Sequence, residues 1–440
     1  MRERLPPDLY QYLPNESLSV QHFLDIKLPS YLETTPFLQP QKYLSGLEPT
    51  TTKADEILCL PSPPESTVKI LTKLIHDEAV KSIECPHSAS VTRGCRYPVW
   101  IVLIWQELFH IRRDQKRWQH AVTNFETGRS LEAGHKIFNA VKTALLYTPW
   151  TGQLQGFTNT IDLQQLSAYL THEWLTDEYE LLMLDVLKSD LLANNCTNIF
   201  IEDPAFATLL EVAYENQEDY TTSKGYQWIH TRGEELASGQ KQYLATIVNQ
   251  HDMHWTAVVI DFEQHEILYG DLFQNAMDSN LCSILDWWVQ EHSGQLFAHR
   301  LLPITRPQDN FSCGMLAWDA IHCYLLPSPC RPLMDHRYPR IERAKMFLEL
   351  TKFYRPIRRI LFQTTRIWNC QQPPTTQASQ PNHCHTFPVN IMLLKHHKAT
   401  RKRHTQVLQY TMHSMEASVK DCFAISERLH IKSMKIIFIE

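Results

Sequence analysis

One cysteine of the sequence stands where a thiol could act as a nucleophile. Cys313 lies in NFSCGMLAWDA, between a polar turn and the start of a predicted helix. The N–H groups and dipole of a helix N-terminus favour a thiolate, so this position is expected to lower the thiol pKa. Gly314 has no Cβ, which would let a substrate backbone approach the sulfur. None of the other ten cysteines has this sequence context.

Three further side chains could complete the machinery of a cysteine hydrolase. His254 begins the predicted strand HWTAVVID and could act as the base, and Asp271 ends the next predicted strand and could orient the imidazole. Gln308, five residues before Cys313, could donate its amide N–H to an oxyanion beside the Cys313 backbone N–H. Asp261 competes for the role of the acid, but it ends the strand that His254 begins, so Asp271 is preferred.

Alternating helix and strand patterns supply the elements that would hold these groups. The segment 174–192 predicts a helix with Thr176 as its N-cap and acidic residues in its first turn. Short apolar runs then predict the strands of one sheet, and a buried helix follows Cys313. The strands are expected at 243–248, 254–261, 265–273 and 296–303, and the later helices at 315–326 and 340–362.

Composition divides the chain into four regions. A Pro- and Ser/Thr-rich arm, expected to be mostly irregular, covers 1–66, and a small helical subdomain follows at 67–150. The catalytic region is expected at 151–365. Residues 366–440 combine a low-complexity linker with the basic cluster KHHKATRKRH. Histidines and Cys384 in this tail lack the spacing of metal ligands, so neither a metal nor an organic cofactor is expected.

The overall composition indicates a mostly globular protein. Hydrophobic residues make up 43% and charged residues 20%, which excludes wholesale disorder. With 12 glycines and no glycine-rich phosphate-binding motif, nucleotide-dependent chemistry is disfavoured. The N-terminus lacks the apolar core of a signal peptide, and no apolar run is long enough to span a bilayer. An intracellular location, nuclear or cytoplasmic, without a membrane partner is therefore expected, with most of the eleven cysteines as free thiols.

The formal net charge of −6 conceals an acidic part and a basic part. Residues 162–330 contain six Lys/Arg and 25 Asp/Glu, a formal charge of −19, whereas 331–440 contain 19 and seven, a charge of +12. An acidic surface favours a basic partner and repels nucleic acid. The basic tail could serve as an import signal or contact nucleic acid weakly. A merely solvated acidic surface followed by a disordered tail would explain the same charges, and this alternative stays open.

Four spaced motifs within 155–330 together resemble the ubiquitin-like-protein-specific cysteine proteases, which include the SUMO/sentrin proteases and the deneddylases. The resemblance implies an α+β, papain-like fold, in which the helix carrying the nucleophile packs against a sheet carrying the base and the acid. It implies Cys313 as nucleophile, His254 as base, Asp271 as orienting acid and Gln308 as oxyanion donor. The motifs are Trp174-Leu175-Thr176-Asp177, His254-Trp255, Asp271, and Gln308 followed by Ser312-Cys313-Gly314.

The resemblance also implies a substrate. Trp174 and Trp255 would form a tunnel over the Gly-Gly tail of a ubiquitin-like modifier, with Gly314 beside it, and Asp177 would meet a basic residue of the modifier. The implied reaction is hydrolysis of the peptide or isopeptide bond after that tail through a Cys thioester, as in SUMO-type processing or deconjugation. The Gln-Asp-x-x-Ser-Cys-Gly form looks like that of divergent members found in fungi, often linked to mobile genetic elements.

Two other functions stay open. An acyltransferase could use the same scaffold, as bacterial effector acetyltransferases with the same His, acid, Cys order do. Those enzymes lack both tryptophan motifs, so the presence of both here favours a protease. A catalytically weak binding module could instead recognise a ubiquitin-like or basic partner without cutting it. The intact set of His254, Asp271, Gln308 and Cys313 argues against that alternative.

Overall fold

The computed structural model divides the chain into two compact units, which are described separately. Among the described residues, the first unit comprises those within 1–195, 249–256 and 303–353, and the second comprises 196–248 and 257–302. Gln308 and the whole of the predicted linker and basic tail lie outside the described residues. The described residues are 7–33, 40–58, 61–75, 80–84, 95–127, 135–251, 253–306, 309, 311–326, 334 and 339–353.

The N-terminal part of the first unit is built from short elements that bury apolar side chains. Val20 and Phe23 are fully buried, and Phe23 stacks on Trp150 with ring centroids 4.0 Å apart. The arm that the sequence predicts to be mostly irregular therefore includes short packed elements. The elements are 3-10 helices Pro7–Tyr12 and Pro40–Tyr43, helices α1 (Val20–Leu24), α2 (Ala54–Leu58) and α3 (Glu65–Leu74), and the antiparallel strands β1 (Leu44–Ser45), β2 (Ser82–Glu84) and β3 (Arg96–Pro98).

A long helix, α4 (Trp100–Thr127), continues the first unit and lies within the region where the sequence predicts a helical subdomain. Trp105 and Trp118 are buried in it, and the Trp118 indole N–H donates to the carbonyl of Trp150 over 2.9 Å. Helix α5 (His135–Leu145) follows, then strands β4 (Gln153–Leu154) and β5 (Ile161–Asp162). No described helix combines the length and the apolarity that a membrane span needs.

Helices α6 and α10 carry two of the predicted motifs of the first unit, and helix α11 and a 3-10 helix lie beside them. Helix α6 begins directly after Thr176, as predicted, and α10 packs against it through the Trp318 indole N–H, which donates to the Met183 carbonyl over 2.6 Å. Helix α11 contacts both the 3-10 helix and α6. The bounds are Leu163–Leu170 for the 3-10 helix, Asp177–Ala193 for α6, Cys313–Leu325 for α10 and Pro339–Phe353 for α11.

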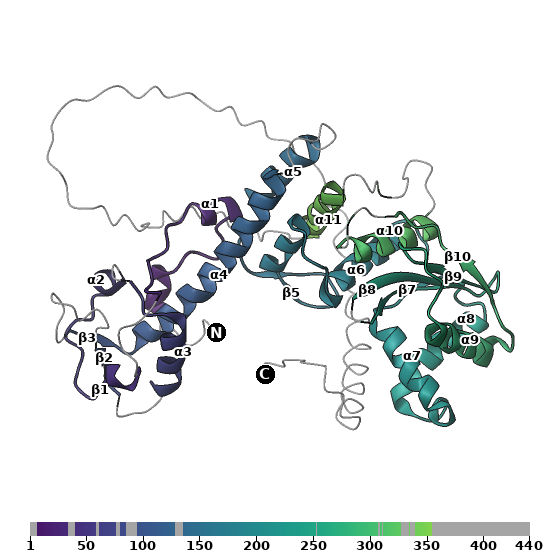
Figure 1. The fold of residues 1–440 in the computed structure, drawn as a ribbon, viewed down its shortest axis with the longest axis horizontal. Helices are drawn as coiled ribbons and strands as arrows, with labels where there is room; N and C mark the ends of the chain where they lie inside the picture. Colours follow the sequence, from purple (N-terminus) through teal and green to yellow (C-terminus); the bar gives the residue numbers. More distant parts are fainter. Residues whose placement is uncertain are drawn as a thin grey trace, which may run out of the picture. The chain divides into compact units, whose positions relative to one another are not determined.

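The second unit is a five-stranded mixed sheet with helices packed on it (Figure 1). The strand order is β10-β9-β8-β7-β6, with β8 and β9 antiparallel and the outer pairs β10-β9 and β6-β7 parallel. Alternate residues on β8 and β9, such as Val258 and Ile267, form one core with Trp288 of α9. The strands are β6 (Ile199–Ile201), β7 (Tyr243–Gln250), β8 (His254–Asp261), β9 (Glu266–Gly270) and β10 (Ala298–Leu301), and the helices α7 (Ala205–Glu215), α8 (Gln227–Ala237) and α9 (Ser279–Ser293).

All four predicted strands are present, with shorter ends for two of them. Strand β9 ends at Gly270 rather than 273, and β10 covers only Ala298–Leu301. The sequence reasoning missed strand β6 and the helices α7, α8 and α9. Strand β8 is continuous across the boundary between the units, since its first three residues belong to the first unit.

Candidate active site

The first unit places Cys313 at the first residue of helix α10, with 8% of its surface exposed. The turn before it is fixed by Asp309, a residue that the sequence reasoning did not single out. One carboxylate oxygen of Asp309 accepts the backbone N–H groups of Phe311 and Ser312 over 3.0 and 2.9 Å. The other oxygen accepts the Ser312 hydroxyl over 2.9 Å. This turn gives the thiol a fixed direction at the start of the helix.

Trp255 connects the three motifs of the first unit. Its backbone N–H donates to the Cys313 thiol, and its indole N–H donates to the carbonyl of Leu175 over 3.0 Å. Trp255 is buried, whereas Trp174 and Asp177 are exposed. The His-Trp, Trp-Leu-x-Asp and Ser-Cys-Gly segments therefore lie close together. Trp255 is buried there, whereas Trp174 faces solvent.

The Cys313 thiol differs from the expectation of a lowered pKa. Burial raises its pKa, and the charge of Glu180 adds to the increase. Backbone N–H groups of Trp255, Gly314 and Cys313 itself act in the predicted direction and favour the thiolate, but burial outweighs them. A base that accepts the thiol proton is therefore needed to form the nucleophile.

His254 belongs to the first unit and Asp271 to the second. His254 begins β8, as predicted, and is half-buried. Asp271 follows directly after β9, whose last residue Gly270 pairs with Ala257 of β8. The Asp271 carboxylate is buried and accepts the backbone N–H of Phe273 over 2.8 Å. The interaction of Asp271 with His254 stays a prediction, as does the role of Gln308.

The competing acid, Asp261, has a structural task of its own. One oxygen of its carboxylate accepts the backbone N–H groups of Glu263 and Gln264 over 2.9 and 3.0 Å. These bonds close the turn between β8 and β9. Burial raises the pKa of Asp261 although both hydrogen bonds oppose the increase. This carboxylate therefore stabilises the hairpin at the end of β8 opposite to His254.

Glu180 is a buried acid beside the nucleophile that the sequence reasoning missed. It lies in the first turn of α6 and has no exposed surface. Neither carboxylate oxygen has a hydrogen-bond partner among the described residues. A Cβ at Gly314 would collide with this carboxyl group, so any larger residue there would force the Glu180 side chain to move. The expected role of Gly314 in substrate approach stays a prediction.

Arg343 on α11 holds the segments around the nucleophile together. Its guanidinium is fully buried and donates to three backbone carbonyls, those of Phe311 at 3.3 Å, Ala168 at 2.7 Å and Glu173 at 2.8 Å. Burial lowers its pKa to about 10, so the group is cationic at neutral pH. Phe311 lies in the turn before the nucleophile, and Glu173 precedes Trp174. Arg343 therefore ties both motifs to α11.

Comparison with known proteins found a family model that matches part of the chain. Residues 173–351 match the family model described as the Ulp1 protease family, C-terminal catalytic domain. The predicted recognition is thereby confirmed for that segment, and so is the α+β, papain-like fold class, with the nucleophile at a helix N-terminus. A search of curated proteins gave no match for this chain.

Several solved structures match part of this chain at low sequence identity and low TM-score. The yeast Ulp1 protease domain, solved in complex with Smt3, the yeast ortholog of SUMO, is 18% identical with a TM-score of 0.37, over 49% of this chain and 94% of that one. The Xanthomonas campestris effector XopD, bound to ubiquitin, is 20% identical with a TM-score of 0.28, over 39% and 91%. The Ulp1-like SUMO protease catalytic domain of Chaetomium thermophilum is 11% identical with a TM-score of 0.33, over 41% and 73%.

Proposed function

Because residues 173–351 form a catalytic domain of the Ulp1 protease family, we propose that this protein hydrolyses the bond after the C-terminal Gly-Gly of a ubiquitin-like modifier. The observation that carries the proposal is the position of Trp255. Its backbone N–H contacts the Cys313 thiol and its indole holds Leu175, so the nucleophile and both tryptophan motifs share one place. A SUMO-type modifier is the proposed substrate.

The proposed reaction passes through a thioester. His254 accepts the Cys313 proton, and the thiolate attacks the carbonyl carbon of the terminal glycine. The backbone N–H of Cys313 and the Gln308 amide stabilise the oxyanion. The bond from that carbon to nitrogen then breaks, and the amine leaves with the proton held by His254. Water hydrolyses the thioester, which releases the modifier with a free carboxylate and returns the thiol.

Specificity in this proposal comes from excluding side chains at the tail. Trp255 would form the buried wall of a narrow passage and Trp174 its exposed cover, which leaves room for glycine only. The exposed Asp177 at the start of α6 would pair with a basic residue of the modifier. Binding energy away from the scissile bond would then position the tail for attack.

A catalytically weak binding module is the second candidate function. The observation that favours it is Glu180, because an ionised carboxylate beside Gly314 opposes a Cys313 thiolate. In that case the protein would bind a ubiquitin-like tail without cleaving it. The two functions differ in whether the thiol reacts, which can be measured directly.

The test uses ubiquitin-like modifiers whose C-terminal carbonyl is replaced by an electrophile. A protease forms a covalent adduct with one of them and cleaves the matching modifier fusion. Cys313→Ala should abolish both results, while Cys323→Ala, a second thiol on the same helix, should retain both. Labelling that persists in Cys313→Ala would refute the assignment, and binding without adduct or cleavage would favour the binding module.

A further inference from the structure

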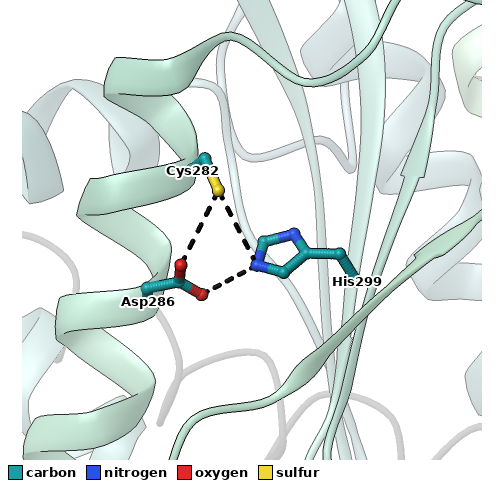
Figure 2. A group of neighbouring side chains, drawn as sticks. All are labelled: Cys282, Asp286 and His299. Atoms are coloured by element: carbon teal, nitrogen blue, oxygen red, sulfur yellow. Dashed lines mark hydrogen bonds and ion pairs between the residues drawn. The ribbon is translucent and has the colours of Figure 1, made fainter.

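Three side chains of different chemistry converge on the second unit, apart from the proposed nucleophile (Figure 2). They are the thiol of Cys282, the carboxylate of Asp286 and the imidazole of His299. The sulfur lies 3.6 Å from Asp286 Oδ2 and 3.8 Å from His299 Nε2, and His299 Nε2 lies 2.8 Å from Asp286 Oδ1. Thiolate, imidazole and carboxylate are the side chains that bind zinc in proteins.

Regular elements hold these side chains in place. Cys282 and Asp286 are four residues apart on helix α9, so both project from one face of it. His299 lies on strand β10, where it pairs with Ile267 of β9 in a parallel register. Helix α9 ends at Gly294 in the left-handed conformation, with φ of 75°, and the chain then turns back into β10. The three donors thus come from two adjacent elements of one unit.

The geometry does not fit a second nucleophile with its own base and acid. In such a triad, one ring nitrogen of the histidine faces the nucleophile and the other faces the acid. Here a single nitrogen, His299 Nε2, faces both the Cys282 sulfur and the Asp286 carboxylate. Three donor atoms directed at one point are instead the arrangement of ligands around an ion.

We propose that Cys282, Asp286 and His299 form a binding site for a divalent transition-metal ion of the zinc type, with a water molecule as fourth ligand. Metal–sulfur bonds of about 2.3 Å and metal–nitrogen or metal–oxygen bonds of about 2.0–2.1 Å at tetrahedral angles place donor atoms roughly 3.3–3.6 Å apart. Both distances from the sulfur are close to that range. The imidazole and carboxylate need to separate by roughly half an ångström, when two metal bonds replace their hydrogen bond.

The ligand types indicate which metal would bind, and the exposure of the site indicates whether water can reach the metal. A thiolate and an imidazole favour zinc and similar ions over magnesium or calcium, which prefer oxygen ligands. Cys282 and Asp286 are half-buried and His299 is exposed, so water can reach the fourth position. A bound ion would join α9 to the edge strand β10 and stabilise the folded unit.

This group could not be predicted from the sequence, because its members do not follow a recognised ligand spacing. Cys282 and His299 are 17 residues apart and no C-x-x-C pair is present. The histidines and Cys384 of the C-terminal tail, which the sequence analysis considered, are a separate possible source of metal binding. An experiment on the full chain must therefore distinguish the two groups.

The test is titration of the full-length protein with Co²⁺ and displacement by Zn²⁺. A sulfur-to-cobalt charge-transfer absorption band should appear at low micromolar metal, disappear on addition of Zn²⁺ and be absent in Cys282→Ser. His299→Gln and Asp286→Asn should each weaken Zn²⁺ affinity by more than the roughly 10–100-fold lost with an outer-shell partner. Cys196→Ser, another half-buried thiol of the second unit, and Cys384→Ser should retain the band.

Thermal unfolding separates loss of the ligands from loss of the fold. Without added metal, Cys282→Ser should unfold at nearly the same temperature as the unsubstituted protein, since its side chain is half-buried. With Zn²⁺ only the unsubstituted protein and the two control variants should gain stability. Any of three results would overturn the proposal. The absorption band could persist in Cys282→Ser, it could be lost only in Cys384→Ser, or binding could occur only at millimolar metal.

Discussion

At the level of single residues, Glu180 is an ionisable side chain in a fully buried position. A fully buried carboxyl group without a hydrogen-bond partner among the described residues is costly when ionised. Burial raises its pKa well above the usual range, the Arg343 cation opposes that increase, and Asp177 adds to it. Tyr169 and the Cys313 thiol also interact with its charge.

A pH dependence of stability follows for Glu180. Its pKa is raised in the folded state, so its contribution to stability is fully present below the unfolded pKa of about 4.3 and is lost as pH rises through the folded pKa. The slope for one proton is up to about 1.4 kcal/mol per pH unit. Glu180→Gln should therefore gain stability relative to the unsubstituted protein as pH rises.

Urea unfolding at several pH values measures this effect. Glu178→Gln is the matched control, because it removes an exposed carboxylate from the same turn of α6. Its stability should follow the unsubstituted protein across the pH range. Parallel curves for Glu180→Gln and the unsubstituted protein would show that this carboxyl group has the same pKa in the folded and unfolded states.

The two candidate acids differ in what their loss should affect. Asp271→Asn keeps an oxygen that can accept the Phe273 N–H but removes the charge that would orient His254, so kcat should fall by on the order of 10⁴-fold. Asp261→Asn weakens the turn between β8 and β9 and should cost up to about 1 kcal/mol of stability with little change in kcat. Steady-state kinetics and urea unfolding of both variants distinguish the roles. The reverse pattern would make Asp261 the orienting acid.

At the level of elements, α11 positions the site through one side chain. Removing the Arg343 guanidinium leaves three backbone carbonyls without their donor, and each lost bond costs about 1 kcal/mol or more. Arg343→Met should therefore lower the free energy of unfolding by about 3 kcal/mol or more. Lys345→Met on the same helix loses only an exposed ion pair with Glu342 and should change stability by less than about 1 kcal/mol. Equal effects in urea unfolding would contradict this role.

The sequence predicted the helices and strands that neighbouring residues indicate by capping or by apolar periodicity. Thr176 before an acidic helix turn indicated the start of α6, and the alternating run from His254 indicated β8. The joint order of the motifs indicated the family and, with it, the fold class. The polar turn before Cys313 indicated the start of α10. The direction of the pKa shift of the Cys313 thiol could not be predicted, because it depends on burial. That burial arises when α6 packs against α10.

Contacts between distant segments could not be predicted in this way. Arg343 bonds to carbonyls 32, 170 and 175 residues away, and periodicity gives no information on such contacts. In the sequence, Glu180 looks like an ordinary charged residue in the first turn of a helix. Its burial is evident only from its packing against Gly314. Cys282 and His299 become neighbours only when β10 returns beside β9.

At the level of the whole molecule, charge is the property that bears on partner choice. Residues 162–330 have a formal charge of −19, and Asp177 and Glu178 at the start of α6 are both exposed. A surface of one sign speeds the approach of a partner of opposite sign, and salt weakens this effect. The Debye length falls from about 8 Å at 0.15 M ionic strength to about 3 Å at 1 M.

These charges predict how cleavage of a Gly-Gly-tailed modifier depends on salt. If the acidic surface steers a basic modifier, kcat/KM should fall as ionic strength rises. Asp177→Asn should lower kcat/KM at low salt and flatten its salt dependence without changing the reactivity of Cys313 toward a small electrophile. Glu178→Gln removes the same charge one residue away, so a direct contact of Asp177 predicts a smaller effect there. If the curves of both variants coincide with that of the unsubstituted protein, the acidic surface contributes solubility rather than recognition.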